Sequence, residues 1–284
     1  DRVYFTRGSG LFSIGMDGHD ERQHLSSQWA SDFRISPDER WVAWVERFQA
    51  YVRPFLPTGG SVQVGPGSRD VPQHRVSRDA GDHLHWSGDG ARLHWSLGPE
   101  LFTLEMASSF TWAPGSEDAE EVELPLSEGT PIGFRVASDR PSGVVAFENA
   151  RILTMRDGEV IEGGTLVVEG NRIAAVGAAG AVEIPAGAHR IDASGHTIMP
   201  GIIDVHQHGG QGFGEIIPRQ NRSNYAQLAF GVTTIHNPSA GTNQIMAAAE
   251  MARAGRVVAP RIFSTGTILY GATSGSTAEV NSLE

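Results

Sequence analysis

The chain has 284 residues, a length that suggests about two domains at roughly 150 residues each. It carries 22 basic and 33 acidic side chains, and its net charge of −11 argues against a non-specific nucleic-acid binder, which needs a basic face. The sequence contains no cysteine, and all 22 basic residues are arginine. Disulfides, cysteine nucleophiles, Walker lysines and Schiff-base lysines are therefore excluded within this chain.

The apolar runs and the N-terminus of the sequence bear on where the protein is located in or outside the cell. No apolar run approaches the roughly 18 residues of a membrane span, so no span is expected. The chain starts at Asp1 rather than Met, and no charged-then-apolar leader is visible. A clipped N-terminus fits this start, and we suspect a secreted or periplasmic protein whose leader has been removed.

A repeat occupies the first part of the chain. Two segments, 33–44 and 84–95, have the pattern of a strand, a turn and a second strand. Three residue types recur between them at a constant offset: Ser36 with Ser87, Asp38 with Asp89, and Trp44 with Trp95. The short segments 11–14 and 101–104 also resemble each other. A period of about 50 residues with several short strands predicts propeller blades, and an ordinary antiparallel domain with recurring turns is the alternative.

These repeats resemble the blades of TolB-like and tricorn-like β-propellers over residues 1–125. Two to three blades fit there, whereas a closed propeller takes about four to eight. We therefore expect that upstream sequence or a partner chain completes the ring. The acidic stretch 113–121 is typical of a loop, and residues 126–142 are predicted to be a linker.

Residues 143–200 predict a small β-domain. The expected strands are 144–147, 150–155, 164–169 and 172–176, and Asp157-Gly158 and Gly170-Asn171 are turn pairs of the hairpin kind.

From residue 201 the pattern alternates between strands and helices. A buried strand is expected at 202–208, followed by strands at 232–236 and 261–264. Ser223 is the expected cap of a helix at 224–230, and Thr242 that of a helix at 243–254. Strand–helix–strand order predicts parallel pairing, in either a doubly wound sheet or a (β/α)8 barrel.

Two histidines stand where such folds place their chemistry. His206 and His208 come at the carboxyl end of the first predicted parallel strand. On a strand, residues two apart point to the same side, so both imidazoles can ligate one metal ion or a metal pair. A second such pair, His83 and His85, lies inside the repeat and is interpreted as structural, because His85 occupies the strand position of Arg34 in the other copy.

Several segments in order resemble the metal-dependent amidohydrolase superfamily, in particular its imidazolonepropionase-like and prolidase-like members. The segments are Pro200–His208, Asn149–Met155, Gly170–Gly177, Ala193–Gly195 and Gly231–Ile235. The resemblance covers about residues 144–270. It implies a small β-sandwich (143–200) and the first three β/α units of a TIM barrel (201–284). With the partial β-propeller (1–125) and the linker (126–142), the expected fold class is multidomain.

The resemblance also implies an activity. His206 and His208 match the first two metal ligands of a hydrolase that cleaves an amide or cyclic-amide C–N bond of a small or dipeptide-like substrate. The expected cofactor is one or two divalent ions, most often zinc. The remaining ligands and the catalytic aspartate would lie beyond residue 284, in further sequence or another chain, and a homo-oligomer is one way to supply them. The chain is thus expected to be an internal fragment.

Three further residues are candidates for this site. Asp204 is expected either to orient a ligand imidazole or to be a polar residue of the lower barrel. His236 is expected either to contact substrate or to be a loop histidine, and Tyr270 is a third candidate. The glycine-rich stretch 209–214 predicts a mobile loop or a plain turn. The alternative function is a peptide- or protein-binding propeller on a non-catalytic scaffold.

Overall fold

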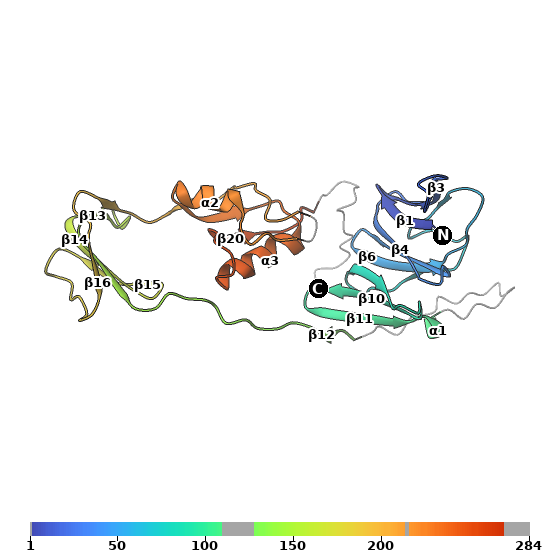
Figure 1. Cartoon of the computed structure of the whole chain (residues 1–284), viewed down its shortest axis with the longest axis horizontal. Helices are drawn as coiled ribbons and strands as arrows, with labels where there is room; N and C mark the ends of the chain where they lie inside the picture. The colour runs from blue at the N-terminus through green and yellow to red at the C-terminus, as the bar shows by residue number, and fades with distance from the viewer. Residues whose placement is uncertain (1, 110–127, 214–215, 270–284) are drawn as a thin grey trace. The chain divides into compact units, whose positions relative to one another are not determined.

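The computed structural model describes residues 2–109, 128–213 and 216–269 (Figure 1). It divides into two compact units: the first runs to Phe134 and includes Leu269, and the second comprises Arg135–Ile268. Both consist largely of small open sheets. No helix in the described ranges is long and apolar enough to cross a membrane.

Three four-stranded sheets form the first unit, and each contains a meander of three antiparallel strands and one short fourth strand. The first sheet has the order β1 (Arg2–Arg7), β2 (Gly10–Gly15), β3 (Arg22–Ser26) and β7 (Val62–Gln63). The second has the order β4 (Ala30–Ile35), β5 (Trp41–Glu46), β6 (Gln49–Pro54) and β8 (His74–Arg75). The third has the order β12 (Thr130–Pro131), β11 (Glu100–Glu105), β10 (Arg92–Leu97) and β9 (Asp82–Trp86), and the one-turn helix α1 (Met106–Ser109) follows β11.

The repeated turns make the same contacts in both copies. Ser36 Oγ donates to Asp38 Oδ1 at 2.6 Å and accepts the Trp41 N–H at 2.9 Å. Ser87 Oγ likewise donates to Asp89 Oδ1 at 2.5 Å and accepts a backbone N–H five residues on. The Ser-x-Asp signature therefore closes one hairpin in the second sheet and one in the third, as the sequence predicts.

The core of this unit lies on both sides of the middle sheet. In β5, Val42 and Trp44 pack into one apolar cluster with residues of β2, β3 and β4. Ala43 and Val45 alternate with them and pack into a second cluster with β9, β10 and β11. Both faces of β5 are therefore buried, which explains its nearly continuous run of apolar residues.

The predicted linker contains one short strand. Thr130 and Pro131, inside the predicted linker, form β12 against β11, and residues 132–142 carry neither helix nor strand. The acidic stretch 113–121 lies outside the described residues.

One five-stranded sheet follows, where the sequence predicts a small sandwich. Its strands are β13 (Val144–Leu153), β14 (Val160–Glu169), β15 (Arg172–Gly177), β16 (His189–Asp192) and β17 (Thr197–Ile198). The two strands predicted at 144–147 and 150–155 are a single strand, β13, whose register shifts near Asn149, a residue with φ +63°. Asp157 and Gly158 both have positive φ and form the predicted hairpin turn.

The last sheet is parallel, with the order β18 (Ile202–Asp204), β19 (Val232–Asn237) and β20 (Arg261–Ser264). Helix α2 (Arg222–Ala229) connects the first pair of strands and helix α3 (Thr242–Arg253) the second. Ile245 and Ala248 of α3 pack with Ile235 and Ile262 of the sheet in a buried cluster. The predicted strand–helix alternation and parallel pairing are confirmed.

Both helix caps differ from the prediction. Asn221 caps α2, because its side-chain oxygen accepts the Ser223 N–H at 2.9 Å, so the helix starts before Ser223. Gly241 is the N-cap of α3 and makes no side-chain cap bond. The hydroxyl of Thr242, the expected cap, lies 3.1 Å from that of Thr267 instead.

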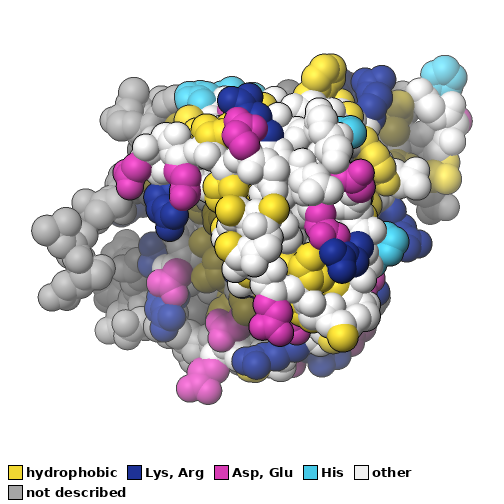
Figure 2. Space-filling model, turned by 90° about the vertical axis from the view of Figure 1, so that its left-hand side faces the viewer, with side chains coloured by type: hydrophobic (Ala, Val, Ile, Leu, Met, Phe, Trp, Pro, Cys, Tyr) yellow, Lys and Arg dark blue, Asp and Glu magenta, His cyan; other side chains and the backbone are white. Residues whose placement is uncertain are grey.

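Charged side chains of both signs are interspersed on the face shown in Figure 2. In the second unit, for example, the Arg190 guanidinium donates twice to the Glu148 carboxylate, with both distances 2.6 Å. These hydrogen bonds lower the pKa of Glu148. The pairing of the scarcer arginines with the surplus acids lessens repulsion among the negative charges.

Candidate metal-binding site

The first parallel strand is shorter and more exposed than predicted. β18 ends at Asp204, and the chain bends at Val205 and His206 instead of continuing as a strand to His208. Its side chains are not buried: Ile203 is 59% and Val205 71% exposed. The physical reason is that β18 is an edge strand with one partner, β19, and its register shifts between Ile202 and Ile203.

Beyond this strand end, the imidazoles of His206 and His208 converge. Their Nε2 atoms lie 3.1 Å apart, and the ring planes meet at 67° with centroids 5.0 Å apart. Two nitrogens held at about 2.0–2.1 Å from a tetrahedral zinc ion are separated by about 3.3 Å. The spacing therefore fits two adjacent positions of one coordination sphere, and the rings reach it through a bend rather than through strand alternation.

Asp204 contacts the backbone of this bend. Its Oδ1 accepts the His206 N–H at 3.1 Å, the two-residue contact typical of an Asx turn. Among the described residues, this carboxylate makes no hydrogen bond with either imidazole, so its contact orients the main chain that carries His206 rather than a ring.

His236 holds the other side of the bend. It lies in β19, and its carbonyl accepts the Gln207 N–H at 3.0 Å. Its Nδ1 lies 3.3 Å from the Val205 carbonyl oxygen. Since a carbonyl can only accept, Nδ1 is the donor in this contact. Tyr270, the remaining candidate, lies outside the described residues.

A small polar cavity begins at Gly209, immediately after His208. Its volume is about 180 Å³, and its lining includes Gln211, Asn237, Ser239 and Gln244. Asn237 is 2% exposed; its amide donates to the Gly209 carbonyl at 3.4 Å and its oxygen accepts the Ser239 N–H at 3.0 Å. The cavity thus lies at the carboxyl ends of parallel strands, where such sheets place ligand sites.

Sequence reasoning missed the amides around this cavity. Gln211 and Asn224 exchange two hydrogen bonds, at 3.2 and 3.0 Å, and both are buried. These bonds tie the glycine-rich stretch to helix α2. The signal available in the sequence was a pair of amides, Gln211 and Asn237, each just after a predicted strand.

Within the described residues, no group of three or more His, Asp or Glu side chains could hold a metal ion. A catalytic zinc takes about three protein ligands and an open position. The two convergent imidazoles therefore fit part of a metal site, and a complete site needs at least one more ligand.

The other His-x-His pair is arranged differently. His83 Nδ1 lies 2.9 Å from Ser96 Oγ, and His85 Nδ1 lies 3.2 Å from the His83 carbonyl oxygen. The His85 ring also stacks on His94, with centroids 4.9 Å apart. Contacts inside the sheet account for these rings, as the structural interpretation expects.

Comparisons with known proteins give partial likenesses to solved structures. No protein-family model matches the chain, and no curated protein matches it. A protein assigned as a prolidase from Bifidobacterium longum matches at 22% identity and TM-score 0.39, over 50% of this chain and 35% of that one. Molinate hydrolase matches at 26% identity and TM-score 0.37, over 45% of this chain and 31% of that one. Phenylurea hydrolase B matches at 29% identity and TM-score 0.36, over 44% and 31%.

The chain thus spans about a third of the length of these structures. TM-scores this low do not establish a shared fold.

Proposed function

We propose that this chain contributes the first two metal ligands of a hydrolase that cleaves amide or cyclic-amide C–N bonds. The observation that supports it best is the 3.1 Å approach of His206 Nε2 and His208 Nε2 at the carboxyl end of a parallel strand. A His-x-His pattern in a sequence is weak evidence for a metal site by itself. Here the Nε2 atoms of both histidines converge, and a cavity lined by amides begins at the next residue.

A divalent ion at this place, zinc by our proposal, would lower the pKa of a bound water and supply hydroxide near neutral pH. His206 and His208 would hold it through the Nε2 lone pairs. Asp204 and His236 act through the main chain, because their hydrogen bonds fix the bend between the two ligands. Asn237 and Gln211 line the cavity that begins at Gly209, the residue after His208, and by our proposal a small or dipeptide-like amide would lie there.

We propose further that the parallel sheet is the beginning of a (β/α)8 barrel. Helix α3 covers one side of the sheet, whereas Ile203 and Phe263 are more than half exposed. Exposed strand edges and apolar side chains are features that proteins normally cover. Further strands, from sequence beyond residue 284 or from another chain, would cover them and bring the remaining ligands and a catalytic aspartate.

For the remaining domains, we propose that residues 1–125 are part of a TolB-like β-propeller and that residues 143–200 belong to a β-sandwich. Support for the propeller comes from three consecutive four-stranded sheets and from hairpins that repeat the same Ser-x-Asp contacts. A middle sheet that is buried on both faces also agrees with blades packed side by side.

The function is tested with the natural polypeptide that contains this chain. Purified with zinc, it is expected to hydrolyse members of a panel of dipeptides, N-acyl amino acids and cyclic amides. His206→Ala and His208→Ala should each reduce the rate at least about a hundredfold, whereas His85→Ala should leave it unchanged. Equal rates in all four proteins, or no hydrolysis by the unsubstituted protein, would contradict the proposal.

A further inference from the structure

A buried carboxylate faces a cavity in the first unit, far along the chain from the two ligand histidines. Glu46, the last residue of β5, is 3% exposed. It lines a cavity of about 330 Å³ together with Gln28, Gln63, Ser68 and the backbone around Gly65. A charged group this deeply buried is costly unless a cation or hydrogen-bond donors compensate it.

Only one oxygen of this carboxylate is satisfied. Ser27 Oγ accepts the N–H groups of Trp29 and Ala30, at 3.1 and 3.0 Å, so its own proton is directed to Glu46 Oε2, at 3.0 Å. Within the part of the chain that the structure describes, Ser27 is the hydrogen-bond donor to the Glu46 carboxylate and reaches Oε2 rather than Oε1, and Oε1 is not among the fully enclosed side-chain atoms that lack a partner, so a ligand can reach it from the cavity.

The neighbouring cation does not compensate the charge. Arg47 packs its guanidinium over the ring of Trp29, with Cζ 5.6 Å from the ring centroid. The residues that line the cavity are uncharged apart from Glu46. Glu46 is therefore the acidic group of a polar hollow that opens to solvent and whose lining includes the exposed side chains of Gln28 and Gln63.

Space in front of the carboxylate is left open by a glycine. A Cβ at Gly65 would lie 3.9 Å from both Oε1 and Oε2. The loop that carries Gly65 is held in place, because its carbonyl accepts both the Gln73 side-chain amide, at 2.7 Å, and the Ser68 N–H, at 3.0 Å. The opening is thus built into the wall of the cavity.

We propose that this cavity binds a primary ammonium group, of the kind carried by a peptide N-terminus or a lysine side chain. An ammonium has three donors; one would bind Glu46 Oε1, and the lining offers the amide and hydroxyl oxygens of Gln28, Gln63 and Ser68 for the other two. A guanidinium binds best to both oxygens of a carboxylate at once, and here Ser27 occupies Oε2. A metal ion is disfavoured because the described residues supply no group of three acidic or histidine ligands.

Calorimetric titration of the chain tests this proposal with four probes: a tripeptide with a free N-terminus, its N-acetylated form, N-acetyl-lysine methylamide and methylguanidine. We expect binding of the tripeptide, the lysine derivative or both, with at least about tenfold weaker binding of methylguanidine. Binding of the tripeptide alone identifies an N-terminus as the ligand, and binding of the lysine derivative alone identifies a side chain. Binding of neither amine would overturn the proposal.

Two variants and one control locate the site. Glu46→Gln keeps an oxygen for Ser27 but removes the charge, and Gly65→Ala puts a methyl group in front of the carboxylate; each should weaken amine binding at least about tenfold. Glu105→Gln, an exposed acid of β11, should bind as the unsubstituted chain does. Thermal melting confirms that the variants fold. Unchanged affinity in a folded Glu46→Gln chain would refute the assignment.

Discussion

The backbone N–H of Gln207 donates to the carbonyl oxygen of His236 at 3.0 Å, which fixes the residue between the two candidate ligand histidines against strand β19. On the other side, Asp204 accepts the His206 N–H at 3.1 Å. The convergence of the two imidazoles therefore depends on hydrogen bonds on each side of a bend, and the bond from His206 N–H to the Asp204 side chain can be removed by substitution without changing either ring.

Replacement of Asp204 separates its two possible roles. Asp204→Ala removes the acceptor for the His206 N–H, and we expect metal affinity to fall about 10- to 100-fold, the range for groups that orient ligands. Asp204→Asn retains an acceptor oxygen without the charge, so it should lose much less. If both variants lose equally, Asp204 acts through its charge rather than through the bend. Zinc titration of the three chains is the measurement.

Substitution of the serine in each repeated turn is expected to lower stability by a different amount. Ser36 is 1% exposed, and Ser36→Ala removes the donor to Asp38 and the acceptor of the Trp41 N–H. We expect it to lower the free energy of unfolding by about 1–3 kcal/mol, the cost of an unsatisfied buried group. Ser87→Ala, at the more exposed equivalent turn, should cost less. Urea denaturation of both variants tests this order, and a larger loss for Ser87→Ala would contradict it.

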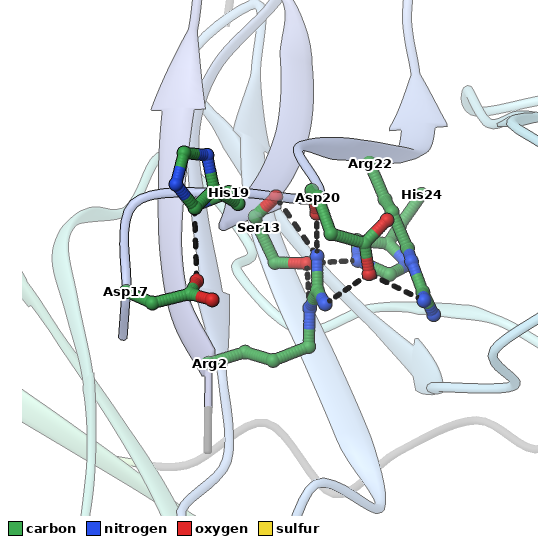
Figure 3. A network of polar contacts seen from close by, with 7 residues as sticks. All are labelled: Arg2, Ser13, Asp17, His19, Asp20, Arg22 and His24. Carbon is green, nitrogen blue, oxygen red and sulfur yellow. Dashed lines mark hydrogen bonds and ion pairs between the residues drawn. The ribbon is translucent and has the colours of Figure 1, made fainter. Parts of the chain in front are cut away.

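A histidine in the first sheet makes stability depend on pH (Figure 3). His24 Nε2 lies 2.6 Å from Ser13 Oγ, which also accepts a hydrogen bond from Arg2 Nε at 2.7 Å. Its ring packs near Tyr4 and Phe55, each with centroids 5.6 Å away. Burial lowers the pKa of His24, and the positive charges of Arg2 and Arg22 lower it further, against a small opposite effect of Glu39.

The sign of the effect follows from this lowered pKa. Below about pH 6.5, His24 is protonated in the unfolded chain but not yet in the folded chain, because its pKa is lower in the folded state. The contribution of His24 to the free energy of unfolding is therefore complete above that pH and is lost as the pH falls toward the folded-state pKa. His74 and His94 act in the same direction, since burial also lowers the pKa of each. His24→Gln should therefore reduce, without abolishing, the loss of stability between pH 7.5 and 5.5. Urea denaturation at both pH values measures it, and an unchanged loss would contradict the account.

Local patterns in the sequence were sufficient for much of the fold. The strand at 261–264 has the predicted bounds, and Gly231 and Gly255, both with positive φ, follow the helices where glycine is expected. The Ser-x-Asp turns were predictable because their hydrogen bonds form within a few residues. The first residues of the helices were harder to predict from the sequence. Asn221 and Ser223 are both good N-caps, and which of them caps helix α2 depends on the packing of the whole segment.

The candidate site was predictable in its residues but not in its geometry. Strand alternation placed His206 and His208 on one face, whereas β18 ends at Asp204 and a bend brings the rings together. That bend depends on a hydrogen bond from Gln207 to His236, residues 29 positions apart by their numbers, which no local pattern encodes. The amides Gln211 and Asn237 each follow a predicted strand, but their burial depends on hydrogen bonds to Asn224 and Gly209, which are more distant in the sequence.

The most direct test of the central claim is zinc binding by this chain at pH 7.5, followed by calorimetry. We expect one ion per chain, with affinity reduced at least about tenfold in His206→Ala and in His208→Ala. The double variant His83→Ala/His85→Ala controls for histidine content and should bind as the unsubstituted chain does. Equal binding by the unsubstituted chain and the double variant His206→Ala/His208→Ala would show that the convergent imidazoles hold no metal.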